Sequence, residues 1–231
     1  MKSIKAIFTK QAKDMLKNPA VLIQFIIFPA VALTMTLLVA HGNDDIPNNM
    51  FVQMMASIFA GMGLIMSVTA IIAEDIEVKS LRFLIIAGVK PHQYLIGVGG
   101  FILLAGSITS VFFALIGDFT GVEIIKFLAI MIPGVMASIV LGATIGMFSK
   151  NAQAASGLAM PFALIIGFVP MIANFNDTVY RFARFIYTQQ INVIVNDLSG
   201  DLARPLTVIA INIAVLVVLF VIAYKKKGLK G

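Results

Sequence analysis

The titratable side chains of this chain are most concentrated in residues 74–92, EDIEVKSLRFLIIAGVKPH. Asp75 and Lys79 are spaced as an i,i+4 ion pair in the favourable order on a helix. Glu74 precedes that pair and Glu77 lies between its two members, but nothing in the sequence completes a plausible catalytic pair. The stretch therefore predicts a polar helix that could dock onto a partner protein. An intramembrane enzyme is the least favoured function.

A second group that could do chemistry is formed by His41, Asp44 and Asp45, which have side chains that can bind metals. They lie in a short polar stretch where nothing fixes their geometry, so a solvated loop is the preferred interpretation. The sequence contains no Cys, which excludes disulfides, thiolate metal sites and a thiol nucleophile. We expect no metal and no bound cofactor in this chain.

The sequence also lacks a source of energy for transport. No GxxxxGK[ST] phosphate loop is present, so this chain is not expected to hydrolyse ATP itself. The interiors of the long apolar blocks contain no Asp, Glu or His, whereas ion-coupled carriers, proton relays and intramembrane hydrolases need such groups there. Any active transport would therefore take its energy from a partner.

The elements that must position these residues are apolar blocks about one bilayer thick. The chain is 60% hydrophobic and 12% charged, far from the soluble average of about 25% charged. A helix rising 1.5 Å per residue crosses a 30 Å hydrocarbon core in about 20 residues. The blocks that meet this length are residues 21–40, 51–73, 94–116, 123–148, 154–173 and 206–224. The sequence thus predicts an all-α integral membrane protein with six transmembrane helices.

The basic residues predict the orientation of the six spans. Thirteen of the 17 Lys and Arg residues fall in segments on one side of the membrane. They are Lys2, Lys5, Lys10, Lys13, Lys17, Lys79, Arg82, Lys90, Lys150, Lys225, Lys226, Lys227 and Lys230. Positive residues stay cytoplasmic, so both termini are expected in the cytoplasm. This pattern explains the pI near 9.6 without a nucleic-acid partner.

The first 19 residues predict an amphipathic elbow helix. Ile4, Ile7 and Phe8 fall on one helical face, and Lys13 and Lys17 fall on the other with further lysines. Such a helix would lie in the cytoplasmic interface with its apolar side toward the lipid. Asn18-Pro19 then ends it, because a residue before Pro avoids the helical region.

The polar stretch after the second span predicts a short cytoplasmic helix. Val78, Leu81 and Leu84 form an apolar stripe, Gly88 suits a helix C-terminal cap, and Pro91 suits the first turn of the third span. A helix over residues 76–87 would be long enough to dock onto a partner, although an interfacial helix without a partner has the same pattern.

Several prolines and glycines predict irregular or close-packed spans. Pro29 indicates a kink whose freed carbonyl must be satisfied by a neighbouring helix. Glycines in the third and fourth spans permit close helix packing. Pro161 and Pro170 are expected to interrupt the fifth span. Residues 174–204 are too polar to cross and predict a re-entrant or interfacial pair of helices on the outer face.

In this arrangement the chain resembles the type-2 permease family of ATP-binding-cassette exporters, over essentially its whole length. The resemblance rests on Lys17-Asn18-Pro19, Pro29, the stretch from Ala73 through Leu81, residues 146–161 (GMFSKNAQAASGLAMP) and the outer helical segment. The chain departs from the family pattern with Ser80 for Thr and Val78 for Gly, and with Thr188-Gln189-Gln190 in place of Asn-Pro.

The resemblance implies a single permease domain, 1–231, in the plasma membrane of a bacterial cell. Its parts would be the elbow helix (1–19), spans 1–2 (20–73), the coupling-helix loop (74–92), spans 3–5 (93–173), extracellular helices (174–205), and span 6 with a basic tail (206–231). It implies a second permease chain, the same or related, and two cytoplasmic ATPase subunits as partners, with ATP and Mg²⁺ bound by the ATPase subunits. The ATPase-coupling residues implied are Glu74, Asp75, Glu77, Lys79, Leu81, Arg82, Phe83 and Leu84. Residues implied to line the path are Met54, Met62, Met66, Phe162 and Phe168.

The function that these expectations favour is the membrane subunit of an ATP-driven exporter of an amphipathic peptide, a lipid or a hydrophobic drug. The alternative is a membrane immunity protein that sequesters a toxic peptide without transport. A secondary carrier driven by the proton gradient is a third possibility.

Overall fold

The computed structural model describes residues 2–43 and 46–229, and every regular element in these two stretches is a helix. Asp44 and Asp45, two of the three residues considered as metal ligands, lie outside the described residues. In chain order the elements are α1 (Lys2–Lys17), α2 (Pro19–Met35), the π-helical η1 (Thr36–Ala40), α3 (Met50–Ile58), the π-helical η2 (Phe59–Gly63), α4 (Leu64–Glu77), α5 (Ser80–Ile86), α6 (Pro91–Ile116), α7 (Val122–Phe148), α8 (Ala152–Ala173), α9 (Asp177–Ala183), α10 (Tyr187–Asn196) and α11 (Ala203–Leu229).

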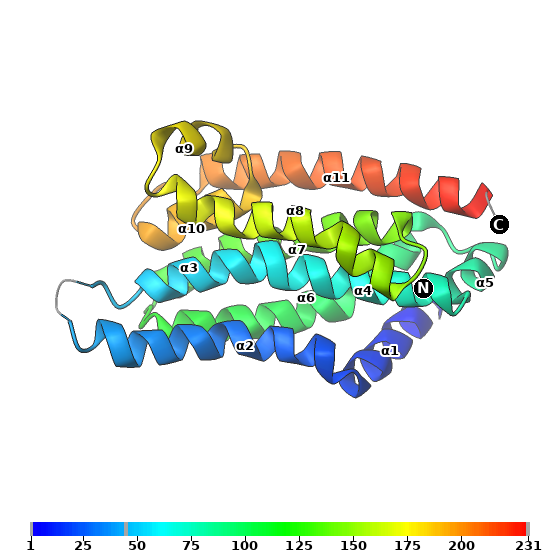
Figure 1. The fold of residues 1–231 in the computed structure, drawn as a ribbon, viewed down its shortest axis with the longest axis horizontal. Helices are drawn as coiled ribbons and strands as arrows, with labels where there is room; N and C mark the ends of the chain where they lie inside the picture. The colour runs from blue at the N-terminus through cyan, green and yellow to red at the C-terminus, as the bar shows by residue number, and fades with distance from the viewer. Residues whose placement is uncertain (1, 44–45, 230–231) are drawn as a thin grey trace.

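Six helical stretches are long and apolar enough to cross a membrane, which confirms the predicted fold class. They are α2 with η1, the joined α3, η2 and α4, then α6, α7, α8 and α11. Figure 1 shows both termini and α5 at one end of the bundle, called here the terminal end. The short helices α9 and α10 follow the fifth span and lie at the other end, the distal end, as an odd number of crossings requires.

The core of the bundle forms around α7, which packs against α4, α6 and α11. Gly142 and Gly146 make the contact with α4 possible, because a Cβ on either residue would lie within 2.8 Å of a Val68 or Ile72 side chain. The predicted close packing of the fourth span is therefore confirmed, and its partner is the second span.

The proline-containing spans keep their helical form because other helices satisfy the freed carbonyls. Proline has no N–H, so Pro29 leaves the carbonyl of Phe25 without its usual helical partner, and Thr109 Oγ1 of α6 donates to that oxygen at 3.3 Å. Pro170 likewise frees the carbonyl of Ile166, which accepts from Thr188 Oγ1 of α10 at 2.6 Å. The predicted interruption of the fifth span is wrong, since α8 runs unbroken through both of its prolines.

Candidate functional site at the buried carboxylate of Asp75

The corner between α4 and α5 is built by an unusual backbone conformation. Lys79 adopts φ 60°, the left-handed region, between the end of α4 at Glu77 and the start of α5 at Ser80. This turn directs Ser80 back toward α4, where its Oγ donates to Asp75 Oδ1 at 2.7 Å and to the Asp75 carbonyl at 3.2 Å. The predicted Asp75–Lys79 ion pair is wrong, because the helix ends before Lys79 and Asp75 binds a different lysine.

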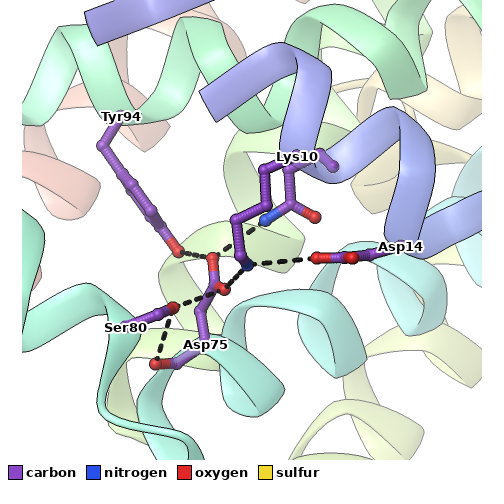
Figure 2. A network of polar contacts seen from close by, with 6 residues as sticks. Lys10, Asp14, Asp75, Ser80 and Tyr94 are labelled. Atoms are coloured by element: carbon purple, nitrogen blue, oxygen red, sulfur yellow. Dashed lines mark hydrogen bonds and ion pairs between the residues drawn. The ribbon is translucent and has the colours of Figure 1, made fainter. Parts of the chain in front are cut away.

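That lysine is Lys10, on the amino-terminal helix. Lys10 Nζ lies 2.6 Å from Asp75 Oδ1, and the neighbouring Gln11 donates through Nε2 to Asp75 Oδ2 at 2.9 Å. Tyr94 of α6 donates through its hydroxyl to the same Oδ2 at 2.8 Å. Figure 2 shows these donors converging on one carboxylate, with Asp14 on the far side of the Lys10 ammonium at 3.3 Å.

The carboxylate of Asp75 is fully occupied by these contacts. It has about four lone-pair positions, and donors from Lys10, Gln11, Ser80 and Tyr94 use them all. Burying a charge is costly unless it is paired and hydrogen-bonded, and Asp75 is only 3% exposed. Its environment therefore suits a fixed structural role rather than that of a proton acceptor or a nucleophile. We call Asp75 together with these four donors the joint. Among the described residues, no group of three or more His, Cys, Asp or Glu could hold a metal ion.

The charge on Lys10 is favoured by this joint. Burial alone would lower the pKa of the Lys10 ammonium, but its hydrogen bonds and attraction to Asp75, and then to Asp14, outweigh burial and raise the pKa above its usual value. The Lys10 ammonium thus stays charged through the physiological range, and its contact with Asp75 attaches α1 to α4.

The joint connects five helices at the terminal end. Asp75 links α1, α4, α5 and α6 directly. The Tyr94 ring packs against Tyr224 of α11 with centroids 5.8 Å apart, and the Tyr224 hydroxyl donates to the carbonyl of Val89 at 2.9 Å. A displacement of α5 is consequently resisted by side chains from α1, α6 and α11 together.

This site adds a buried acidic group at the end of the second span, beyond the apolar interior in which the sequence contains no Asp, Glu or His. The second span continues as helix through Glu77, so Asp75 belongs to its last turns and is buried. Sequence reasoning placed residues 74–77 in the loop because their polarity marks the edge of the apolar block. The coupling segment predicted over 76–87 accordingly divides, and only its second part, from Ser80, forms α5.

The residues of the predicted elbow helix lie on α1, and part of its apolar face packs against the third span. Ile7 is buried against Gly97, and Phe8 packs edge-on against Phe101 with centroids 5.9 Å apart. Ile4 is half-buried, while Lys13 and Lys17 are exposed. The glycines of the third span thus accommodate α1, and the predicted lipid-facing orientation is wrong for Ile7.

The remaining coupling residues separate into buried and exposed sets. Leu81 is 2% exposed and Leu84 is half-buried, so both hold α5 against the bundle. Arg82 and Phe83 are exposed, as are Glu74 and Glu77. The Glu77 carboxylate accepts from the backbone N–H of Ala152 at 3.0 Å, at the amino end of α8, where a negative charge is favourable.

The predicted path-lining residues are not brought together around one opening. Met54, Met62, Met66 and Phe168 are half-buried, whereas Phe162 is 53% exposed on α8. Met62 and Met66 pack where the second and fifth spans touch. Contact is closest at Gly61, where a Cβ would lie 2.5 Å from the Gly167 Cα. These two spans are therefore closed against each other at this level.

A second polar cluster lies at the distal end around α10. Ser138 Oγ donates to the Ala60 carbonyl in η2 at 2.6 Å and lies 2.9 Å from the Tyr187 hydroxyl. Gln53 of the second span donates through Nε2 to the Asn192 Oδ1 at 3.2 Å. The departures from the family pattern, Thr188-Gln189-Gln190, are all buried in α10. The predicted outer helical pair is thus partly a buried element of the bundle.

Sequence reasoning missed Lys10, Gln11 and Tyr94 as partners of Asp75. One signal for them was present, because Gln11 falls on the same helical face as Ile7 and Met15. A polar side chain on a buried face needs a hydrogen-bonding partner. That partner lies 64 positions away, beyond the reach of any local pattern.

Comparison with known proteins identifies the family. The family model described as ABC-2 family transporter protein matches residues 2–225, nearly the whole chain. No curated protein matches the chain. The six-span all-helical fold and this match agree with the resemblance stated from the sequence. This multi-pass membrane protein therefore belongs to the ABC-2 transporter family, as a membrane permease subunit.

Proposed function

We propose that this permease subunit is driven by a separate ATP-binding-cassette ATPase that docks on α5, and that it exports an amphipathic or hydrophobic substrate from the cytoplasm. The single observation that carries the proposal is the apolar surface of α5 and its corner. Val78, Phe83 and Ile86 are 59%, 69% and 73% exposed at the terminal end, outside the apolar spans. Exposed apolar groups at such a place mark a site where another protein binds.

The anchoring of α5 supports this role. Leu81 packs inward and Ser80 is bonded to Asp75, so force applied to the exposed face would pass into α4 and α1. The segregation of basic residues to the terminal end supports a cytoplasmic location for this face. Because the sequence holds no phosphate loop, the ATP and Mg²⁺ belong to the partner.

The experiment compares two matched triple variants in membranes of the native cell. V78A/F83A/I86A removes one Val, one Phe and one Ile side chain from the α5 surface. The control V122A/I125A/F182A removes the same three side-chain types, with exposures of 66%, 67% and 74%, from the distal end. Neither triple variant touches the buried core, so both should fold.

We expect the wild type and the control to co-purify with a Walker-type ATPase and to support ATP hydrolysis in the complex, and the α5 variant to lose both. Retention of the ATPase by the α5 variant would overturn the docking site. Absence of any ATPase from the wild-type preparation would favour the immunity protein, which binds its peptide without ATP. Efflux that collapses with the proton gradient while ATP stays high would favour a secondary carrier.

A second permease chain belongs to the same proposal. The second and fifth spans are closed against each other within one chain, at Gly61 and Gly167. A path is therefore more readily formed between two chains than through one, with Phe162 of α8 facing outward toward it. Cross-linking after substitution of single cysteines on α8 tests this directly, because the native chain has none.

A further inference from the structure

We propose that a groove between α2 and α6 binds an acyl chain of an anionic phospholipid whose headgroup contacts Lys13 and Lys17. This inference is independent of the exporter function and of α5. The groove has a volume of about 500 Å³ and opens on the side of the bundle near the carboxyl end of α1. Its lining is apolar with the exception of Thr109.

The hydroxyl of Thr109 does not make the groove polar. It donates to the Phe25 carbonyl that Pro29 leaves without a helical partner, so its hydrogen is already used. Ala30 and Ala105 are small, and they line the groove together with the larger rings of Phe101 and Phe112. The groove therefore presents hydrocarbon only, which an acyl chain matches.

The groove is long enough for one acyl chain. On α2 its lining extends from Leu22 to Leu33, and 11 residues at 1.5 Å each span about 16 Å. On α6 its lining extends from Phe101 to Ile116, and 15 residues span about 22 Å. These lengths are about half to three quarters of a 30 Å hydrocarbon core, so one acyl chain entering from the terminal end would lie along both helices for the depth of its leaflet.

The rim of the groove at the terminal end carries positive charge. Leu16 lines the groove and is 63% exposed, and Lys13 and Lys17, within one helical turn of it, are exposed. The only nearby acid on that stretch, Asp14, is engaged by Lys10 at 3.3 Å. Two lysines beside the mouth of an apolar groove at the membrane surface are complementary to an anionic headgroup. This charge selects a phospholipid over an uncharged apolar molecule.

The experiment is native mass spectrometry of the full chain, purified from nanodiscs that contain equal amounts of phosphatidylglycerol and phosphatidylcholine. Ala30→Phe fills the groove, and Ala210→Phe adds the same ring at an exposed position on α11 outside it. K13Q/K17Q removes the charge at the rim, and K225Q/K226Q removes two exposed lysines from the end of α11.

We expect the wild type to retain phosphatidylglycerol over phosphatidylcholine by about 25-fold, since each of the two lysines contributes about fivefold near a charged surface. Ala30→Phe should lose both lipids, K13Q/K17Q should lose only the preference, and both controls should behave as the wild type. The proposal is overturned if the wild type retains no phospholipid, if Ala210→Phe releases it equally, or if Ala30→Phe instead dissociates a dimer of this chain.

Discussion

The substitution Asp75→Asn offers the most direct test of the joint. Asparagine keeps the size of the side chain but supplies one acceptor oxygen and one NH₂ group in place of two acceptor oxygens. With its oxygen toward Lys10 and Ser80, its NH₂ would face Gln11 and Tyr94, whose amide and hydroxyl can reorient to accept. The principal loss is therefore the negative charge that holds the Lys10 ammonium.

The size of the effect follows from these contacts. A hydrogen bond to a charged group contributes about 1.5–3 kcal/mol, against about 1 kcal/mol between neutral groups. Converting the set around Asp75 to neutral bonds should lower the free energy of unfolding by about 2–4 kcal/mol. Lys10→Met should cost less, about 1 kcal/mol, because the Lys10 side chain is 42% exposed and water screens it. The double variant should lose about 1 kcal/mol less unfolding free energy than the sum of the two single losses.

The assay is thermal unfolding of the purified chain in detergent, read as the fraction that remains monodisperse. At about 2–4 °C per kcal/mol for a chain of this length, Asp75→Asn should lower Tm by about 4–16 °C. Asp14→Asn is the matched control, since Asp14 also pairs with Lys10 but is 50% exposed, and it should change Tm by less than about 2 °C. Strict additivity of the Lys10 and Asp75 losses, or an unchanged Tm for Asp75→Asn, would refute the reasoning.

Three further outcomes follow from the same geometry. The pKa of Lys10 is raised in the folded chain, so the contribution of the Lys10 charge to stability is complete below the unfolded lysine pKa of about 10.4 and is lost as pH rises through the folded pKa. The wild type should therefore have a higher Tm than Lys10→Met below about pH 10.5, and this difference should shrink above that pH. Gly61→Ala should lower Tm by several degrees, because the added Cβ would lie 2.5 Å from the backbone of the fifth span. Gly157→Ala should leave Tm unchanged, because a Cβ there has no atom within 4 Å. Equal effects of the two substitutions would contradict the contact between the second and fifth spans. Thr188→Val should lower the free energy of unfolding by about 1–2 kcal/mol, because it leaves the carbonyl freed by Pro170 unpaired. The control is Thr207→Val, since the Thr207 hydroxyl bonds within its own helix. A smaller loss for Thr188→Val would show that the carbonyl finds another donor.

Much of the fold could be predicted because its determinants are local in sequence. Block length and apolarity fixed the six spans, and Gly88 and Pro91 marked the end of α5 and the start of α6. The requirement that a kinked span needs a donor from a neighbour was also correct, and Thr109 supplies it. The fifth span was misjudged because a proline in a membrane helix is tolerated when neighbouring helices compensate.

The candidate site could be predicted only in part, because its partners are distant in sequence. The acidic stretch drew attention to Asp75. The left-handed backbone conformation of Lys79 could not be recognised from the sequence, because glycine is the usual residue in that conformation. The local rule then selected Lys79 as the partner of Asp75, while the structure selects Lys10, 65 positions away. Pairing across the bundle depends on how α1 lies on α6, and the hydrophobic periodicity of α1 alone does not predict the position of α1 on another helix.

The second span connects the two polar regions of the molecule. Its most apolar stretch is 78% buried, against 17–50% for the other spans, so it is the most enclosed of the six. Asp75 near one end holds α1, α5 and α6, and Gln53 near the other end holds α10. Between them η2 departs from α-helical geometry where the span meets α8 at Gly61. π-Helical turns are rare and are found frequently at functional sites. In the proposed function, a movement of α5 would pass through the Ser80–Asp75 contact into this one buried helix, and η2 is the irregular turn at which that helix meets the fifth span.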